Sequence, residues 1–345
     1  MSKYIFYAAS FDNVLNICEL DTDLGKITHL RRVEHPRPAH IALSKDRLRL
    51  YIANEMNGLP GGVAAYDITD PVNPVLLSSV TPGSQGPCFI ALTNDGKYLV
   101  GCSYFEGNIE VFPVNPDGSL SERCFEYRFT ATGTASLPGL VDQAVPRSHC
   151  VLPVTGSSLM LVTDYSGDSL VCFAINEKGI MENISSVPFP RGDAPRHLAR
   201  HPVRDDLVYM VTEFTSIVYP IRVDRETGGL TVLKGVHTLS GEKASFSSAI
   251  KLSPDGKFVY IPNRNNKNIA ILSLHDNYER LEHAGVIPDA GFVRDVEFAP
   301  SADYLVTGDQ DRNKIILYGV NKENGMCERL GCEIFAETPA CFLFL

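Results

Sequence analysis

The chain has no tryptophan and no closely spaced pair of cysteines. Without tryptophan it lacks the Trp-Asp dipeptide of WD40 repeats and the Trp of sialidase-type Asp boxes, and its two Gly-Gly pairs are too few for kelch repeats. Its nine cysteines are an odd number and form no C-x-x-C motif, which argues against a zinc ribbon or a disulfide framework. We therefore expect free thiols, a reducing cytoplasm, and neither a metal nor a cofactor.

Long apolar runs and positive charge are also scarce. No window approaches the roughly 18 consecutive apolar residues of a membrane-spanning helix, and the N-terminus lacks the basic and apolar regions of a secretory signal. Acidic residues outnumber basic ones by 41 to 31, which gives a net charge of −10. Because such a surface repels phosphate groups, we expect neither a nucleic acid nor a membrane as partner.

An internal repeat runs through the whole chain. Each copy has a short alternating strand, a turn rich in Pro, Asp, Gly or Asn, a second strand rich in β-branched and aromatic residues, then a third and a weaker fourth strand. The copies begin near Pro38, Pro87, Ser148, Pro195, Ser247 and Val293. Four short antiparallel strands in about 40–50 residues is the pattern of a β-propeller blade.

The two ends of the chain supply one further blade. The C-terminal PACFLFL (339–345) matches the first strand of the repeat, and the N-terminal segments KYIFYAAS, NVLNICEL and GKITHLRRV supply three more strands. We therefore predict an all-β fold, a seven-bladed β-propeller with four antiparallel strands per blade, as a single domain over residues 1–345. The ring is closed by pairing the C-terminal strand with the N-terminal strands, so no long edge is exposed. We expect a monomer.

One insert interrupts the regular spacing of the repeat. The segment Phe129–Pro146 is rich in Gly, Pro and small residues and has no strand pattern. Such a segment is predicted to be a loop on one face of the ring. It would either form a wall of a site or be an excursion without function.

Arginine and histidine recur where the first strands of the repeat begin. The first strand of each propeller blade lines the central channel, so these residues should converge from different blades on one mouth. They are His40, Arg147, His149, Arg196, His197 and Arg294. The second strands return to the same mouth, and their ends carry Glu55, Tyr104, Asp164, Glu213 and Arg264. A cationic mouth on an acidic protein suits a phosphate or carboxylate, which arginine binds bidentately.

Several segments resemble the seven-bladed lactonase family, which includes bacterial propeller-type 6-phosphogluconolactonases and a fungal carboxymuconate-lactonising enzyme. They are APRHLARHP, SSAIKLSPDGKFVYIPNR and FVRDVEFAPSADYLVTGDQ, and the resemblance covers essentially the whole chain. It implies a lactonase that acts on a small anionic lactone, with 6-phosphogluconolactone of the pentose phosphate pathway as the expected substrate. A muconate-type lactonising cyclase or another aldonolactonase is the alternative within this class. A non-catalytic repeat propeller that binds a protein partner is the alternative outside it.

The resemblance also implies roles for individual residues. Four residues of this chain are similar to the site of the lactonising enzyme, and we expect them to be catalytic. They are His149, Arg196, Glu213 and Arg264. We further expect His40, Arg147, His197 and Arg294 to bind substrate. Glu213 or His149 would take the proton of the attacking water, and the arginines would stabilise the oxyanion or hold the substrate anion. No Gly-x-Ser-x-Gly elbow is present, so a serine nucleophile is not indicated.

Each of these residues also has a purely structural interpretation. His149 could be a buried histidine, and Arg196 and Glu213 could pair only to tie their strands together. Arg264 could pair with Asp309 instead. His197 should point opposite to Arg196 by strand alternation, which favours packing. Where the family often has a histidine, this chain has Phe89, which would narrow the substrate range or pack the channel wall.

Overall fold

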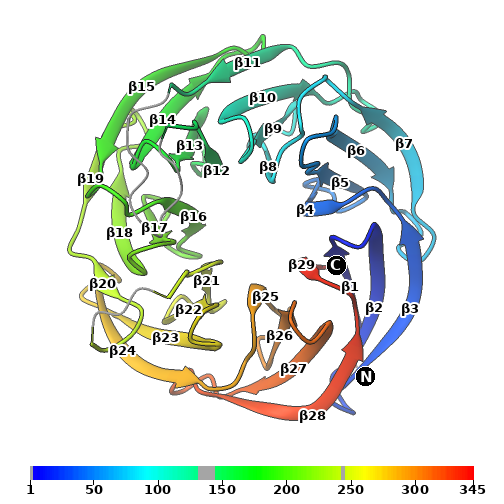
Figure 1. Ribbon diagram of the computed structural model, residues 1–345, viewed down its shortest axis with the longest axis vertical. Helices are drawn as coiled ribbons and strands as arrows, with labels where there is room; N and C mark the ends of the chain where they lie inside the picture. The colour runs from blue at the N-terminus through cyan, green and yellow to red at the C-terminus, as the bar shows by residue number, and fades with distance from the viewer. Residues whose placement is uncertain (1–2, 131–143, 242–244) are drawn as a thin grey trace.

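The computed structural model describes residues 3–130, 144–241 and 245–345, and within them seven antiparallel sheets stand in a ring around a central channel (Figure 1). The predicted seven-bladed all-β fold is confirmed. Six sheets have four strands, and one has five because β20 (Val236–His237) pairs with β18 beside β19. The predicted loop Phe129–Pro146 lies mostly outside the described residues.

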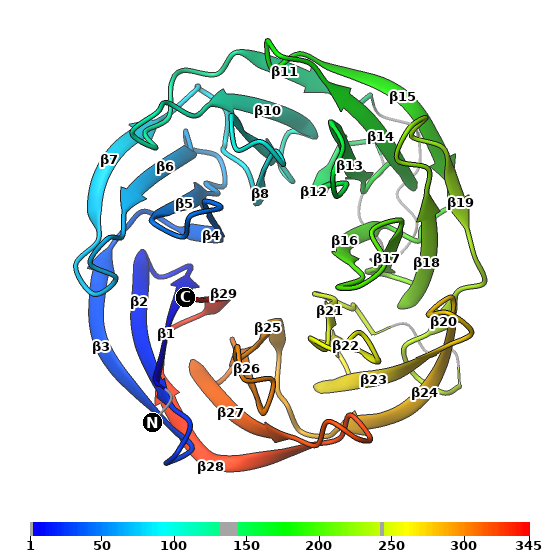
Figure 2. The ribbon, with the colours of Figure 1, turned by 180° about the vertical axis from the view of Figure 1, so that it is seen from behind.

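The strands follow the repeat in the sequence. In ring order the sheets are formed by β29 (Pro339–Phe344), β1 (Lys3–Ser10), β2 (Val14–Asp21) and β3 (Lys26–Glu34); β4 (Pro38–Leu43), β5 (Arg49–Asn54), β6 (Gly62–Asp67) and β7 (Val75–Val80); β8 (Phe89–Leu92), β9 (Tyr98–Cys102), β10 (Asn108–Pro113) and β11 (Phe125–Arg128); β12 (Ser148–Pro153), β13 (Leu159–Asp164), β14 (Ser169–Ile175) and β15 (Met181–Pro188); β16 (Pro195–Arg200), β17 (Leu207–Thr212), β18 (Ile217–Val223) and β19 (Leu230–Val232); β21 (Lys251–Leu252), β22 (Phe258–Asn263), β23 (Asn268–His275) and β24 (Arg280–Ile287); and β25 (Val293–Phe298), β26 (Tyr304–Asp309), β27 (Lys314–Val320) and β28 (Cys327–Phe335). The inner strands β4, β8, β12, β16, β21, β25 and β29 surround the channel in both ribbon views (Figure 2).

The first and last strands of the chain close the ring. β29 pairs antiparallel with β1, so that Phe6 lies opposite Phe344 and Ala9 opposite Cys341. The Phe6 and Phe344 rings pack with centroids 5.0 Å apart in a core shared with β26 and β27. The seventh blade is therefore held by backbone hydrogen bonds and by a buried apolar core, as the sequence predicts.

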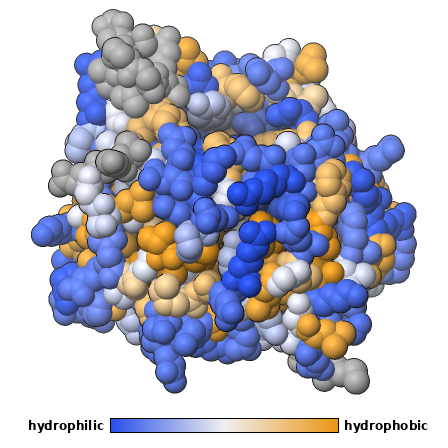
Figure 3. Space-filling view, turned by 60° about the horizontal axis from the view of Figure 1, so that its bottom comes forward, coloured by the Kyte–Doolittle hydropathy of each residue, from blue (hydrophilic) through white to orange (hydrophobic). Residues whose placement is uncertain are grey.

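Burial is greatest in the middle strands of a blade and lowest in its outer strand. All six residues of β13 are buried, because adjacent blades cover both faces of this strand. The outer strand β15 alternates between buried or half-buried and exposed residues near its C-terminal end, as expected for a strand with one face in water. Figure 3 shows hydrophilic side chains interspersed with small apolar patches on one view of the surface. In the described part of the chain, no helix is long and apolar enough to cross a membrane.

One inner strand is shorter than the repeat predicts. The segment from Ser247 forms a ladder only at Lys251–Leu252, with an isolated bridge from Ser247 to Asn263. The neighbouring strand β22 contains Pro262, which has no N–H to donate, so the ladder is interrupted there. The carbonyl of Ser248 accepts a hydrogen bond from an arginine side chain of the adjacent blade instead.

Candidate active site

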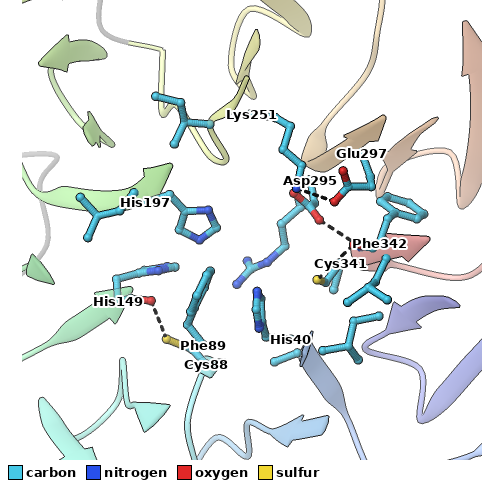
Figure 4. A pocket seen from close by; sticks show the side chains of 17 residues that line it. His40, Cys88, Phe89, His149, His197, Lys251, Asp295, Glu297, Cys341 and Phe342 are labelled. Atoms are coloured by element: carbon cyan, nitrogen blue, oxygen red, sulfur yellow. Dashed lines mark hydrogen bonds and ion pairs between the residues drawn. The ribbon is translucent and has the colours of Figure 1, made fainter. Parts of the chain in front are cut away.

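The central channel contains a cavity of about 210 Å³ that is lined by inner strands of several blades (Figure 4). One wall carries His40, Phe89, His149 and His197, and the other carries Lys251, Asp295 and Glu297. This volume has room for several waters or for part of a small ligand. Because its lining is both aromatic and charged, the cavity suits a small polar molecule.

The first wall is a chain of aromatic contacts. The Phe89 ring stacks on His40 with centroids 3.7 Å apart and meets the edge of His197 at 5.2 Å. His197 in turn lies 5.0 Å from His149. Burial lowers the pKa of His40 to about 3 and holds the pKa values of His149 and His197 well below 6.5. All three imidazoles are therefore neutral at pH 7.

The second wall is a buried group of charges. Lys251 forms an ion pair with Glu297, and Asp295 accepts a hydrogen bond from the Phe342 backbone N–H at 3.0 Å. Burial raises the pKa values of both carboxyl groups, and Lys251 offsets part of that increase. This wall can exchange hydrogen bonds with hydroxyl groups of a ligand.

Outside the lining of this cavity, Glu213 joins two arginines from different blades. Arg196 Nε donates to Glu213 Oε2 at 3.0 Å, and Arg264 Nη2 donates to Oε1. The Tyr165 hydroxyl also donates to Oε2, at 3.0 Å. Burial alone would raise the pKa of Glu213, but the two arginines outweigh it and hold that pKa below its usual value. Glu213 is therefore a firmly ionised carboxylate whose oxygens already have partners.

Backbone carbonyls fix the two arginines further. Arg196, only 1% exposed, donates through Nη1 to the Ser248 carbonyl at 2.7 Å. Arg264 donates through Nε to the Phe246 carbonyl at 2.9 Å. Both guanidinium groups are thus held rigidly. The Glu213 carboxylate partly neutralises their positive charge, so they are less able to bind an external anion.

His149 lies where the arginine network meets the cavity. Its side chain is 4% exposed, lines the cavity, and packs against the Tyr104 and Tyr165 rings with centroids 5.8 Å away. Its Nδ1 atom is buried and has no hydrogen-bond partner among the described residues. A neutral imidazole has one nitrogen that can accept a proton or a hydrogen bond. Because Nδ1 is closed to solvent, a ligand in the cavity would meet the other ring nitrogen, Nε2.

Two other arginines remain without a carboxylate partner. The Arg294 guanidinium lies over the Phe11 ring at 4.8 Å and lines the cavity. Arg147 lies over the Tyr104 ring at 4.4 Å and donates to the Tyr104 carbonyl at 3.2 Å. Neither forms an ion pair with any residue in the described ranges. Arg294 is therefore the cation best placed to meet an anion inside the channel.

The structure brings most of the predicted site residues together. Arg196, Glu213 and Arg264 form one network, and the cavity wall contains His40, His149, His197 and Arg294. Arg147, Arg196, Glu213 and Arg264 are not among the residues that line the cavity. The alternative pairing of Arg264 with Asp309 is wrong, because Arg264 binds Glu213 and Asp309 lies 3.5 Å from Arg312. Strand alternation separates His197 from Arg196, but it turns His197 into the cavity.

Sequence reasoning missed several polar residues at this site. Tyr165 was not among the predicted residues, and neither were Lys251, Asp295 and Glu297 as a group. Asp295 and Glu297 are two positions apart in a strand, so both point to one face, and that spacing within VRDVEF was the available signal. No group of three or more metal-binding side chains occurs within the part of the chain that the structure covers.

The model of a family described as "Lactonase, 7-bladed beta-propeller" matches residues 7–344. A 6-phosphogluconolactonase of Bacillus subtilis is 25% identical over 100% of this chain and 99% of its own length. A 6-phosphogluconolactonase of Formosa agariphila is 25% identical over 79% of this chain and 78% of its own length.

Solved structures show the same architecture. A candidate 6-phosphogluconolactonase of Bacteroides uniformis superposes with a TM-score of 0.92 at 25% identity, covering 100% of both chains. The periplasmic gluconolactonase of Pseudomonas aeruginosa has a TM-score of 0.91 at 19% identity, with 100% of this chain and 99% of that chain covered, and it supports the fold alone.

Proposed function

Because this chain belongs to the seven-bladed β-propeller lactonase family, we propose that it hydrolyses the lactone of a small anionic sugar, with 6-phosphogluconolactone as substrate. The full-length similarity to the Bacillus subtilis 6-phosphogluconolactonase supports that substrate. One observation carries the proposal: Arg294 and His149 both line the same cavity. Arg294 is a cation without a carboxylate partner in the described residues, and His149 is a neutral base. A cytoplasmic location and a place in the pentose phosphate pathway belong to the same proposal.

Arg294 is proposed to hold a negative charge of the reacting molecule. Arg196 and Arg264 already neutralise Glu213, so their charge is partly spent. A charge-assisted hydrogen bond from a free guanidinium contributes about 1.5–3 kcal/mol. The same guanidinium, placed against the lactone carbonyl, would stabilise the oxyanion that forms when water attacks.

His149 is proposed to take the proton of the attacking water. Of the two predicted bases, Glu213 is the weaker, because a proton on it would break ion pairs with two buried arginines. His149 is neutral and lines the cavity. Glu213 then acts as a positioning residue that holds Arg196 and Arg264 in place beside the cavity.

Acid release from fresh 6-phosphogluconolactone tests this function. At neutral pH the protein should release acid well above the spontaneous rate of ring opening, and unphosphorylated gluconolactone should be opened with a higher KM, since it lacks the anion. Arg294→Ala should raise KM at least tenfold, whereas Arg312→Ala, which removes a half-exposed arginine of the same blade, should leave it unchanged. A rate equal to the spontaneous one would refute lactonase activity and favour a binding scaffold.

A further inference from the structure

One wall of the channel cavity takes no part in the proposed reaction. Lys251, Asp295 and Glu297 line this wall, and Figure 4 shows them across the cavity from His149 and His197. Lys251 belongs to β21, and the two carboxylates belong to β25 of the next blade. The three groups lie deep in the ring but remain open to its cavity, because the Lys251 side chain is 34% exposed and that of Glu297 is 19% exposed.

Each of these groups can form further hydrogen bonds after its contacts with the protein are counted. The Lys251 ammonium has three N–H donors and forms one ion pair, with Glu297 Oε2. Glu297 Oε1 accepts the Phe298 backbone N–H at 3.0 Å, and Asp295 Oδ2 accepts that of Phe342 at 3.0 Å. A carboxylate has about four lone-pair sites, so both carboxylates can accept more bonds. Donors and acceptors for a ligand therefore lie side by side.

The charges of this wall favour a part of the ligand that is polar but uncharged. Burial alone would lower the pKa of Lys251, but the Glu297 and Asp295 carboxylates outweigh it and raise that pKa, so the ammonium keeps its proton. The two carboxylates repel an anion, and the ammonium repels a cation. A hydroxyl group meets neither repulsion, because it can donate to a carboxylate and accept from the ammonium.

The opposite side of the cavity offers a flat aromatic surface. Phe89 lines the cavity, stacks on His40 with centroids 3.7 Å apart and meets the edge of His197 at 5.2 Å. These contacts hold the Phe89 ring in one orientation. A sugar ring has C–H groups on its faces and hydroxyl groups around its edge, so it can lie on an aromatic ring while its edge meets polar groups.

We propose that Lys251, Asp295 and Glu297 form a hydroxyl-binding subsite, which selects a polyhydroxylated sugar lactone over a lactone without hydroxyl groups. This role rests on the proposed lactonase function. Arg294 holds the anionic group of the substrate, and the subsite holds neighbouring hydroxyl groups of its ring. A site built to bind hydroxyl groups rejects an analogue without them, because the analogue leaves the polar groups of the protein unpaired. The three residues therefore determine specificity and take no part in the chemical step.

Two uncharged lactones with the same six-membered ring test this subsite. Glucono-δ-lactone carries hydroxyl groups, and δ-valerolactone carries none. For each lactone, kcat/KM is divided by the rate constant of spontaneous opening, which removes the difference in intrinsic reactivity. In the parent protein this ratio should be at least about a hundredfold higher for glucono-δ-lactone.

Variants of the wall should reduce this preference. Lys251→Met removes the ammonium but keeps a long side chain, so the ratio for glucono-δ-lactone should fall at least about tenfold, while that for δ-valerolactone stays within about threefold. Glu297→Gln keeps the size of the side chain and should also lower the ratio for glucono-δ-lactone alone. Lys257→Met is the matched control, because Lys257 lies in the turn between β21 and β22, is 62% exposed and pairs with Asp255 at 3.2 Å. It should leave both ratios unchanged.

Calorimetric binding separates the subsite from the reaction. Gluconate and hexanoate are both six-carbon carboxylates, but only gluconate has hydroxyl groups. The parent protein should bind gluconate at least about tenfold more tightly than hexanoate, and Lys251→Met should lose this preference. A parent protein that opens no lactone refutes the proposed function, whereas a preference for gluconate would still support the subsite.

Three results would overturn the subsite while the lactonase function stands. The first is a parent protein that opens both lactones equally well relative to their spontaneous rates, or binds gluconate and hexanoate equally. The second is an equal loss for both lactones in Lys251→Met, which would show that Lys251 only supports the structure. The third is an unchanged preference in a folded Lys251→Met. If that variant does not fold, an unchanged preference in Glu297→Gln decides against the subsite.

Discussion

Replacing Glu213 by glutamine should destabilise the protein, because it leaves Arg196 and Arg264 buried without their carboxylate. Arg196 is 1% exposed and Arg264 is 8% exposed, so water cannot take over the lost interaction. Removing one partner of a buried ion pair costs about 3–5 kcal/mol. An unfolding entropy of about 2.1 cal/mol/K per residue gives roughly 0.7 kcal/mol/K for this chain. The expected decrease in Tm is therefore about 4–7 °C.

A matched surface carboxylate provides the control for this experiment. Glu333 also bridges two cations, Lys314 and Arg329, but its side chain is 35% exposed. Exposed pairs of this kind contribute between zero and about 1 kcal/mol, so Glu333→Gln should shift Tm by about 1 °C or less. Differential scanning calorimetry at pH 7 measures both variants. Equal shifts for Glu213→Gln and Glu333→Gln would refute the claim that the network is a desolvated structural unit.

The remaining predictions concern ring closure, a buried carboxyl group and the base. Deleting residues 339–345 removes β29 and should give insoluble or early-melting protein, whereas an unchanged Tm would contradict closure by this strand. Burial raises the pKa of Asp164 to about 7, so ionisation costs stability as pH rises from about 4 to 7. The free energy of unfolding of Asp164→Asn, measured in urea, should therefore rise by up to about 4 kcal/mol relative to that of the parent between pH 4 and pH 7. If the difference between the two proteins stays constant over this range, Asp164 does not titrate there. His149→Asn should open the lactone at least tenfold more slowly than the parent. Because the pKa of His149 is below 6.5, the rate of the parent should begin to fall only below pH 6.5. Full activity of that variant would exclude His149 as the base.

The repeat in the sequence predicted the ring because strand alternation and turn residues are local signals. The pairing of β29 with β1 was also predictable, since PACFLFL is a first strand with no second strand after it. The length of β21 was not predicted, because it depends on where Pro262 of the neighbouring strand interrupts the ladder.

The site was predictable in its residue types but not in its pairings. Equivalent positions of a repeat lie at one mouth of the ring, and this predicted that Arg196, Glu213 and Arg264 lie close together. Side-chain distances between blades decide which arginine forms an ion pair with a carboxylate. Arg196 and Arg264 pair with Glu213, whereas Arg294 has no carboxylate partner among the described residues.

A crystal structure of the protein with 6-phosphogluconate, the expected product, would test the central claim most directly. The ligand should lie in the channel cavity, with one of its anionic groups within hydrogen-bond distance of Arg294 and its carboxyl group beside His149. A product bound on an outer face of the ring, or a channel that holds only water at saturating product, would contradict the account.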